Sequence, residues 1–147
     1  MKEPLSSLLR AKGTKVCTIS PSSPVIEAVR QMNSEGIGSL LVTDGDQVVG
    51  IFSERDVLTR VVDRELDPGS TPVSAVMTDE VVAVDSSMSV EDAMAVVTEK
   101  RCRHLPVMDG DVLTGMVSIG DLTKWMGRHH QTHIQDLVNY ITGKYPG

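Results

Sequence analysis

The sequence lacks a segment that could cross a membrane. Its longest apolar stretches, at positions 39–43 and 93–97, are far shorter than the roughly 20 residues that a transmembrane helix needs. Positions 1–13 also lack the apolar core of a secretory signal peptide. These two absences predict a cytoplasmic protein that makes no contact with a membrane.

Cysteine and basic residues are scarce as well. The two cysteines, Cys17 and Cys102, provide neither a disulfide framework nor the spacing of metal ligands, so we expect reduced thiols that serve as small, buried apolar side chains. Lysine and arginine number 14 against 20 aspartates and glutamates, and the formal net charge is −6. Because nucleic acids and anionic lipids bind to extended basic faces, this composition argues against both partners and restricts any phosphate contact to a local site.

What the sequence does contain is an internal repeat. Its 147 residues suit one compact domain or two half-size units that share a core. A shift of 65 positions aligns residues 19–61 with residues 84–126 without a gap. The identical positions include apolar residues, an Asp-Gly-Asp turn and a Gly, Ser and Asp set: Val25/Val90, Ala28/Ala93, Leu40/Leu105, Val42/Val107, 44–46/109–111, Gly50/Gly115, Ser53/Ser118 and Asp56/Asp121.

Each copy predicts the same order of elements, β-α-β-β-α. Apolar residues recur at helical spacing from Val25 and from Val90, and two apolar runs flank each Asp-Gly-Asp turn, a pattern typical of a hairpin. A further helix is predicted to begin near Glu54 and near Ile119. The predicted strands are 15–19, 39–43 and 47–52 in the first copy, and 81–84, 105–108 and 112–117 in the second.

The predicted domain organisation follows from these elements. Leucines before Gly13 indicate a short helix that a glycine ends, and apolar residues from Ile134 indicate a terminal helix. The predicted parts are an N-terminal helix (1–14), a first repeat (15–62), a linker with a short helical turn (63–79), a second repeat (80–126) and a C-terminal helix (127–147). The predicted fold class is α/β, of the α+β kind.

A repeated motif stands where each second hairpin strand meets its helix. Residues 50–56 and 115–121 both read Gly, two apolar residues, Ser, two further residues and Asp. One interpretation is structural, since Ser and Asp at this spacing are close to a capping box, which satisfies free backbone N–H groups. The other is functional, because a helix N-terminus attracts anions, Ser can donate to a phosphate and Asp can accept from ribose hydroxyls.

The duplicated unit and its closing motif resemble the CBS-domain pair, often called a Bateman module, over roughly residues 5–126. The resemblance implies two tandem repeats related by a pseudo-twofold axis, with ligand clefts between their sheets. In that family the motif contacts the phosphate and ribose of AMP, ATP, NAD or S-adenosylmethionine, and strands line the adenine pocket. The implied ligand contacts are Ser53, Asp56, Ser118, Ile119 and Asp121 at the motifs, and Thr18, Ile19, Leu40, Val42, Ala83, Val84, Leu105, Pro106 and Val107 on the strands.

Basic residues before the second hairpin are further candidates. One interpretation of this cluster is a solvated helix end whose cations complement the helix dipole. The resemblance instead implies that Arg103 and His104, just before Leu105, Pro106 and Val107, hold ligand phosphates, with Arg55 as a further candidate inside the first motif. The first copy has neither Arg103 nor His104 at the matching positions, so we expect one cleft to bind nucleotide more tightly than the other.

These features together predict a non-catalytic regulatory module rather than an enzyme, because no histidine at a repeated position could activate the serines. The implied ligand is AMP, ADP, ATP or NAD(H), with S-adenosylmethionine as a further option. A homodimer and a separate effector protein are the implied partners. The alternative is a ligand-free dimerisation scaffold. No metal site is expected, since nothing is spaced to complete one with His129, His130 and His133.

Overall fold

The computed structural model describes residues 3–129, and its contacts divide the chain into two compact units. The central unit is Val16–Val81. The composite unit joins the chain up to Lys15 to the chain from Val82 onward. The N-terminal helix therefore belongs with the second repeat, an association that the sequence did not predict.

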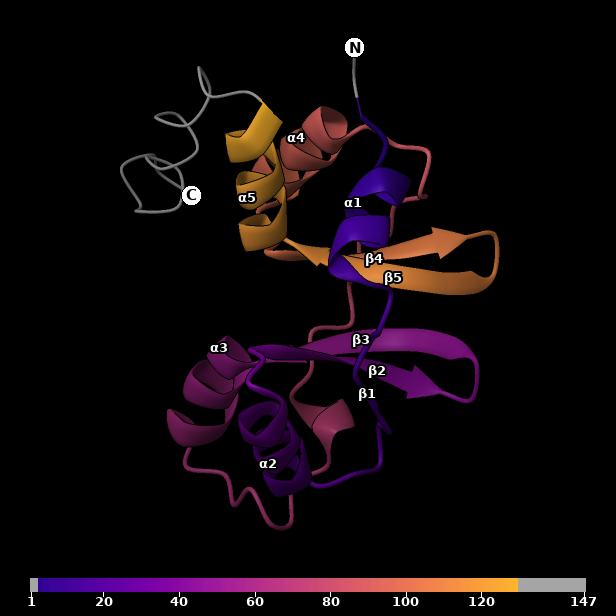
Figure 1. Cartoon of the computed structure of the whole chain (residues 1–147). Coiled ribbons are helices and arrows are strands. Elements are labelled where there is room, and N and C mark those ends of the chain that lie inside the picture. The colour runs from indigo at the N-terminus through magenta and orange to yellow at the C-terminus, as the bar shows by residue number, and fades with distance from the viewer. Residues whose placement is uncertain (1–2, 130–147) are drawn as a thin grey trace. The chain divides into compact units, whose positions relative to one another are not determined.

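The central unit is a three-stranded sheet covered on one face by helices (Figure 1). Strand β1 runs parallel to β2, and β2 is antiparallel to β3, with β2 in the middle. The last element of the central unit is a single turn of 3₁₀-helix. The elements are β1 (Thr18–Ile19), α2 (Val25–Glu35), β2 (Ser39–Asp44), β3 (Gln47–Ser53), α3 (Glu54–Asp56), η1 (Val57–Val62) and η2 (Val73–Ala75).

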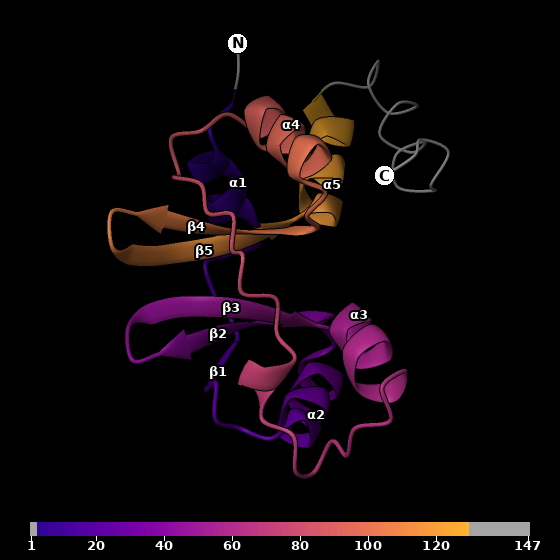
Figure 2. The ribbon, with the colours of Figure 1, turned by 180° about the vertical axis from the view of Figure 1, so that it is seen from behind.

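The composite unit is built on a two-stranded hairpin with its three helices on one face (Figures 1 and 2). Helices α4 and α5 contact one another, and α1 contacts α4. Backbone bonds from Leu5 N–H to Met88 O (2.8 Å) and from Val90 N–H to Glu3 O (2.8 Å) fasten the start of α1 beside α4. The elements are α1 (Leu5–Lys12), α4 (Val90–Lys100), β4 (His104–Asp109), β5 (Val112–Ser118) and α5 (Ile119–His129).

The hairpins form where the Asp-Gly-Asp turns predict them. Gly45 and Gly110 have φ of 62° and 64°, a backbone conformation that glycine adopts without steric cost. Both hairpins carry a register shift at the same place, between Val42 and Thr43 and between Val107 and Met108. The two copies therefore share the register shift of their hairpins as well as the order of their helices and strands.

The helices predicted from Val25 and from Val90 are confirmed, and their apolar residues contribute to the two cores. In α2 the buried residues are Val25, Ala28 and Met32, and in α4 they are Val90, Ala93 and Val97. The N-terminal helix is also confirmed and ends at Gly13, whose N–H donates to Leu9 O at 2.8 Å. The central core comprises Ile19, Val25, Ala28, Met32, Leu40, Val42, Phe52, Val61, Val73 and Val76, and the composite core comprises Leu5, Leu8, Leu9, Val84, Val90, Ala93, Val97, Leu105, Val107, Val117, Leu122 and Met126.

Three elements differ from the prediction, and the first of them, the strand expected at 15–19, is reduced to the two residues of β1. The helix expected after Glu54 has only three α-helical residues before it widens into the π-helix η1, in a stretch rich in β-branched side chains, which crowd a tight helical turn. The strand expected at 81–84 is reduced to one parallel bridge between Val84 and Val107. Immediately after that bridge, the Asp85 side chain accepts the Ser87 N–H at 2.8 Å, and the Ser86 N–H donates to the Asp109 side chain at 3.0 Å, so a local turn replaces the strand ladder.

Within residues 3–129, no helix combines the length and the apolar character needed to cross a bilayer. The predicted C-terminal helix falls almost entirely outside the described residues, as do His130 and His133.

Candidate functional site

At the first motif, Ser53 and Asp56 form a complete capping box at the start of α3. The Ser53 hydroxyl accepts the Asp56 N–H at 3.3 Å, and the Asp56 carboxylate accepts the Ser53 N–H at 3.0 Å. The same carboxylate accepts the hydroxyls of Ser53 and Thr78, each at 3.2 Å, and lies 3.8 Å from Arg60 Nε. Its side chain is 8% exposed. Asp56 is thus buried and engaged by neighbours within its own unit.

At the second motif, Ser118 and Asp121 make the same reciprocal bonds at the start of α5. The Asp121 N–H donates to Ser118 Oγ at 3.1 Å, and Ser118 N–H donates to Asp121 Oδ2 at 2.9 Å. Asp121 Oδ2 also accepts from Lys12 Nζ at 2.5 Å, and Lys12 donates further to Met116 O at 2.8 Å. The Asp121 side chain is 26% exposed. The two motifs therefore share their caps but differ in access, because the second carboxylate reaches the surface.

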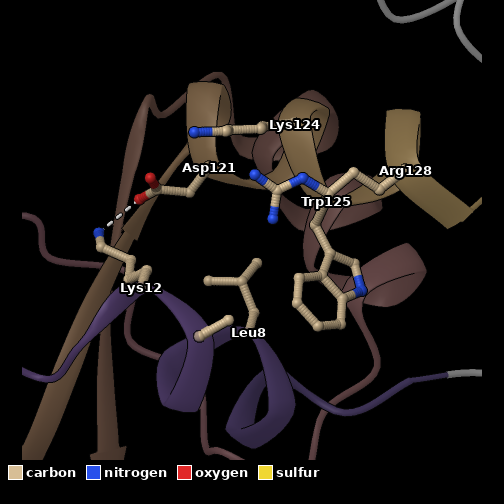
Figure 3. Close-up of a pocket in the computed structure, with 7 residues that line it drawn as sticks. Leu8, Lys12, Asp121, Lys124, Trp125 and Arg128 are labelled. Atoms are coloured by element: carbon tan, nitrogen blue, oxygen red, sulfur yellow. Dashed lines mark hydrogen bonds and ion pairs between the residues drawn. The ribbon is translucent and has the colours of Figure 1, made fainter.

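A pocket opens beside Asp121, between α1 and α5 (Figure 3). Its volume is about 130 Å³. Figure 3 shows Asp121, Lys124 and Arg128 extending from α5 above Leu8, with the Trp125 indole on the other side of the opening. The lining consists of Leu8, Ala11 and Lys12 from α1, with Asp121, Lys124, Trp125 and Arg128 from α5. Three of these seven side chains are cations and one is an anion.

The sequence analysis did not predict the cations of this pocket. One pattern could have indicated those on α5: an i, i+3, i+4, i+7 spacing places Asp121, Lys124, Trp125 and Arg128 on one face of a helix. No local pattern could have added Lys12, because it lies 109 residues from Asp121 in the chain.

The glycine of each motif is explained by packing. A Cβ atom at Gly50 would lie 2.5 Å from Met77 Sδ and 2.9 Å from the backbone oxygen of Thr78. A Cβ atom at Gly115 would lie 2.7 Å from Leu9 Cδ2, a side-chain atom of α1. All three distances are shorter than real contacts of this kind, so each glycine allows a neighbouring segment to pack closely against its strand.

The remaining predicted ligand residues differ in how deeply the structure buries them. The strand residues Leu40, Val42, Leu105 and Val107 are fully buried in the two cores and offer no side-chain surface in this conformation, and Ile19 and Val84 are buried beside them. Pro106 is buried as well, whereas His104, Ser53, Ser118 and Ile119 are half-buried. Thr18, Arg55, Ala83 and Arg103 are exposed. Ligand contact by these residues stays a prediction.

The predicted phosphate clamps Arg103 and His104 flank the second motif without lining the pocket. The Ile119 N–H donates to Arg103 O at 2.9 Å, and His104 pairs with Ser118 across the hairpin. The pocket lining includes neither side chain. Two sets of basic residues thus belong to segments that meet the start of α5: Arg103 with His104 at the hairpin, and the three that line the pocket.

Neither cysteine forms a disulfide, and both are half-buried. Burial raises the pKa of the Cys102 thiol above its ordinary value, which favours the protonated form. Among the described residues, no three His, Cys, Asp or Glu side chains are grouped so that they could hold a metal ion.

The charge on Asp121 depends on its neighbours. Burial favours the protonated acid, but the Lys12 ammonium and the Ser118 bonds outweigh it and lower the pKa of Asp121 below its ordinary value of 3.8. The ionised carboxylate therefore stabilises the fold above pH 3.8, and this contribution is lost as the pH falls through the lowered pKa.

Replacing Lys12 by Met should raise the pKa of Asp121 and lower the free energy of unfolding at pH 7 by about 0.5–1 kcal/mol, a small effect because the pair is partly solvated. The difference from the parent protein should be constant above about pH 5 and narrow below pH 3.8. Urea denaturation across pH 3–7 measures it, and Lys12→Arg is the control that keeps the cation. A difference that does not change with pH would show that the ion pair does not contribute.

Two repeats of a mixed α/β unit, each with a capped serine–aspartate junction, define a tandem-repeat module. The family model of the CBS domain matches residues 13–63 and 73–128. The chain belongs to the CBS-domain family, whose paired domains are generally regulatory and not catalytic.

Three known proteins illustrate the relationship. The CBS domain-containing protein YhcV of Bacillus subtilis is 35% identical over 118 residues, which cover 80% of this chain and 84% of YhcV. A putative signal-transduction protein with CBS domains from Burkholderia ambifaria is 40% identical, with a TM-score of 0.83 over 88% of this chain and 97% of the other. A hexameric CBS-CP12 protein from bloom-forming cyanobacteria is 27% identical, with a TM-score of 0.74 over 83% of this chain and 67% of the other.

Proposed function

We propose that this protein is a regulatory module that binds an adenine nucleotide at its second motif and transmits the binding to a separate effector protein. The observation that carries the proposal is the difference between the two aspartates. Asp121 lines an open pocket among cations, whereas Asp56 is buried and already bonded to Ser53 and Thr78. A ribose needs an acceptor that it can reach, so Asp121 is the better site of the two.

Membership of the family supports the ligand class, since CBS domains commonly bind adenosine ligands. AMP, ADP, ATP and NAD(H) are the leading candidates, and S-adenosylmethionine is a further one. On this proposal the protein is not an enzyme, acts in the cytoplasm and forms a homodimer. Nucleotide binding can shift its conformation only to the extent that the ligand prefers one arrangement of the chain over another.

A thermal-shift panel with these five ligands tests the proposal. A ligand at ten times its dissociation constant stabilises the folded state by about 1.4 kcal/mol, which raises the melting temperature measurably. We expect a shift with at least one nucleotide and its loss in Asp121→Ala. The exposed turn residue Asp111 supplies the matched control, and Asp111→Ala should keep the shift.

The competing function is that of a ligand-free dimerisation scaffold. It is favoured by the exposed apolar side chains of Leu58 and Val62 in η1, which are 64% and 63% exposed. If no nucleotide shifts the melting temperature of the parent protein, the scaffold is the correct interpretation.

A further inference from the structure

The pocket between α1 and α5 concentrates positive charge on a protein that is negative overall. Lys12, Lys124 and Arg128 face one carboxylate, Asp121, which leaves a local excess of two positive charges in a chain of net charge −6. Within residues 3–129, the structure records an acidic partner for Lys12 but none for Lys124 or Arg128. A concave site with an excess of charge of one sign raises the local concentration of the opposite ion, so this pocket favours an anion.

The arrangement of the two cations on α5 indicates which kind of anion fits the pocket. Lys124 and Arg128 are four residues apart on one helical face, where like charges repel each other, and Figure 3 shows both extending over the opening. An anion between them relieves that repulsion. A phosphate ester offers several oxygens to the planar guanidinium and to the ammonium groups, whereas a single carboxylate offers only two.

The size of the pocket sets how much of a ligand it holds. Its volume of about 130 Å³ is well below the roughly 300–1,000 Å³ typical of sites that enclose a whole small molecule. It therefore suits a phosphate group and leaves a nucleoside outside.

Lys12 connects the pocket to Asp121. Its ammonium bonds to Asp121 Oδ2 and to Met116 O, so it occupies one oxygen of the carboxylate that a ribose would need. A phosphate in the pocket offers Lys12 a second anionic partner. When Lys12 moves to the phosphate, Asp121 Oδ2 keeps its bond from Ser118 N–H and can accept a hydroxyl group in place of the ammonium.

We propose that the pocket between α1 and α5 binds the phosphate group of a small phosphate ester through Lys124 and Arg128, and that Lys12 exchanges Asp121 for this phosphate. The inference rests on the proposed function for the nucleoside part of the ligand and names the phosphate contacts of the same site. It assigns them to the pocket cations rather than to Arg103 and His104. It also implies that adenosine, which has no phosphate to draw Lys12 away, binds more weakly than AMP.

Titration calorimetry on the full chain tests the assignment, with AMP, adenosine and pyrophosphate as probes. The double variant Lys124→Gln/Arg128→Gln should bind AMP at least about tenfold more weakly, because charged hydrogen bonds are lost, while adenosine affinity is unchanged. Lys12→Met should bind adenosine more tightly than the parent protein does. Lys100→Gln, which removes an exposed cation at the end of α4, is the matched control and should behave like the parent.

The outcomes separate this inference from the proposed function. If the double variant keeps parental AMP affinity and Arg103→Gln loses it, the phosphate is bound at the hairpin and the inference is wrong, although nucleotide binding stands. If the parent binds pyrophosphate through Lys124 and Arg128 but none of the five ligands of the thermal-shift panel, the pocket is a site for a free phosphate and the nucleotide function is wrong. If the parent binds neither pyrophosphate nor any of these five ligands, both are wrong.

Discussion

Replacing Asp56 with alanine is expected to lower the free energy of unfolding by about 2–3 kcal/mol. The carboxylate accepts hydrogen bonds from Ser53 and Thr78 in a buried position, and its removal leaves these donors without an acceptor. An unsatisfied buried donor costs about 1–3 kcal/mol, and loss of the helix cap adds to that. Urea denaturation measures the loss, and hydrogen exchange localises it to the central unit.

The matched variant is Asp121→Ala at the equivalent position of the second repeat. Its carboxylate is partly solvated, and water can replace it as the partner of Lys12, so the expected loss is only about 1 kcal/mol. Equal losses in the two variants would contradict the distinction between a structural aspartate and an accessible one. The same distinction supports ligand binding at Asp121, so the comparison also bears on the proposed function.

Introducing a methyl group at Gly50 is expected to destabilise the protein by about 1–3 kcal/mol. The new Cβ atom of Gly50→Ala would meet Met77 and the backbone oxygen of Thr78. That oxygen accepts the Ile51 N–H at 2.8 Å, and Thr78 N–H donates to Ile51 O at 2.9 Å, so the segment cannot move away without weakening both bonds. The shift in the urea midpoint measures the cost.

The second repeat again offers the control. In Gly115→Ala the three nearest atoms all belong to the Leu9 side chain, which can shift more easily than a backbone oxygen, so the loss should be smaller than in Gly50→Ala. A double-mutant cycle with Leu9→Ala should show less than additive losses at Gly115, because truncation removes the clash. Met77→Ala should rescue Gly50→Ala only in part, because the clash with the Thr78 backbone remains. Full rescue by Met77→Ala would show that the backbone contact is not the cause.

The two motifs have the same residues and the same caps, but their aspartates have different partners. Both capping boxes form, so the structural interpretation of the motif is correct in each copy. Ligand binding by the motif is proposed for the second copy, at Asp121. Thr78 and Arg60 engage Asp56 from the linker side and from the next helical turn, whereas Lys12 reaches Asp121 from the N-terminal helix.

The sequence by itself was sufficient for the features that depend on neighbouring residues. The apolar stripes from Val25 and Val90, the turns at Gly45 and Gly110, and the helix starts at Glu54 and Ile119 all depend on local periodicity, turn chemistry and capping. These short-range preferences act within a few residues and leave their pattern in the chain. The family resemblance depended on the same patterns, since they recur in both copies.

Only the tertiary structure decided which aspartate is accessible and which cations surround it. The partners of Asp56 and Asp121 include Thr78, 22 residues away, and Lys12, 109 residues away, and no local pattern reports contacts over such separations. Burial is likewise a property of the packed unit, because the equivalent aspartates are buried in one repeat and partly exposed in the other. The sequence therefore determined where the two serine–aspartate junctions form, and packing between distant segments determined which of them has an accessible aspartate beside a pocket.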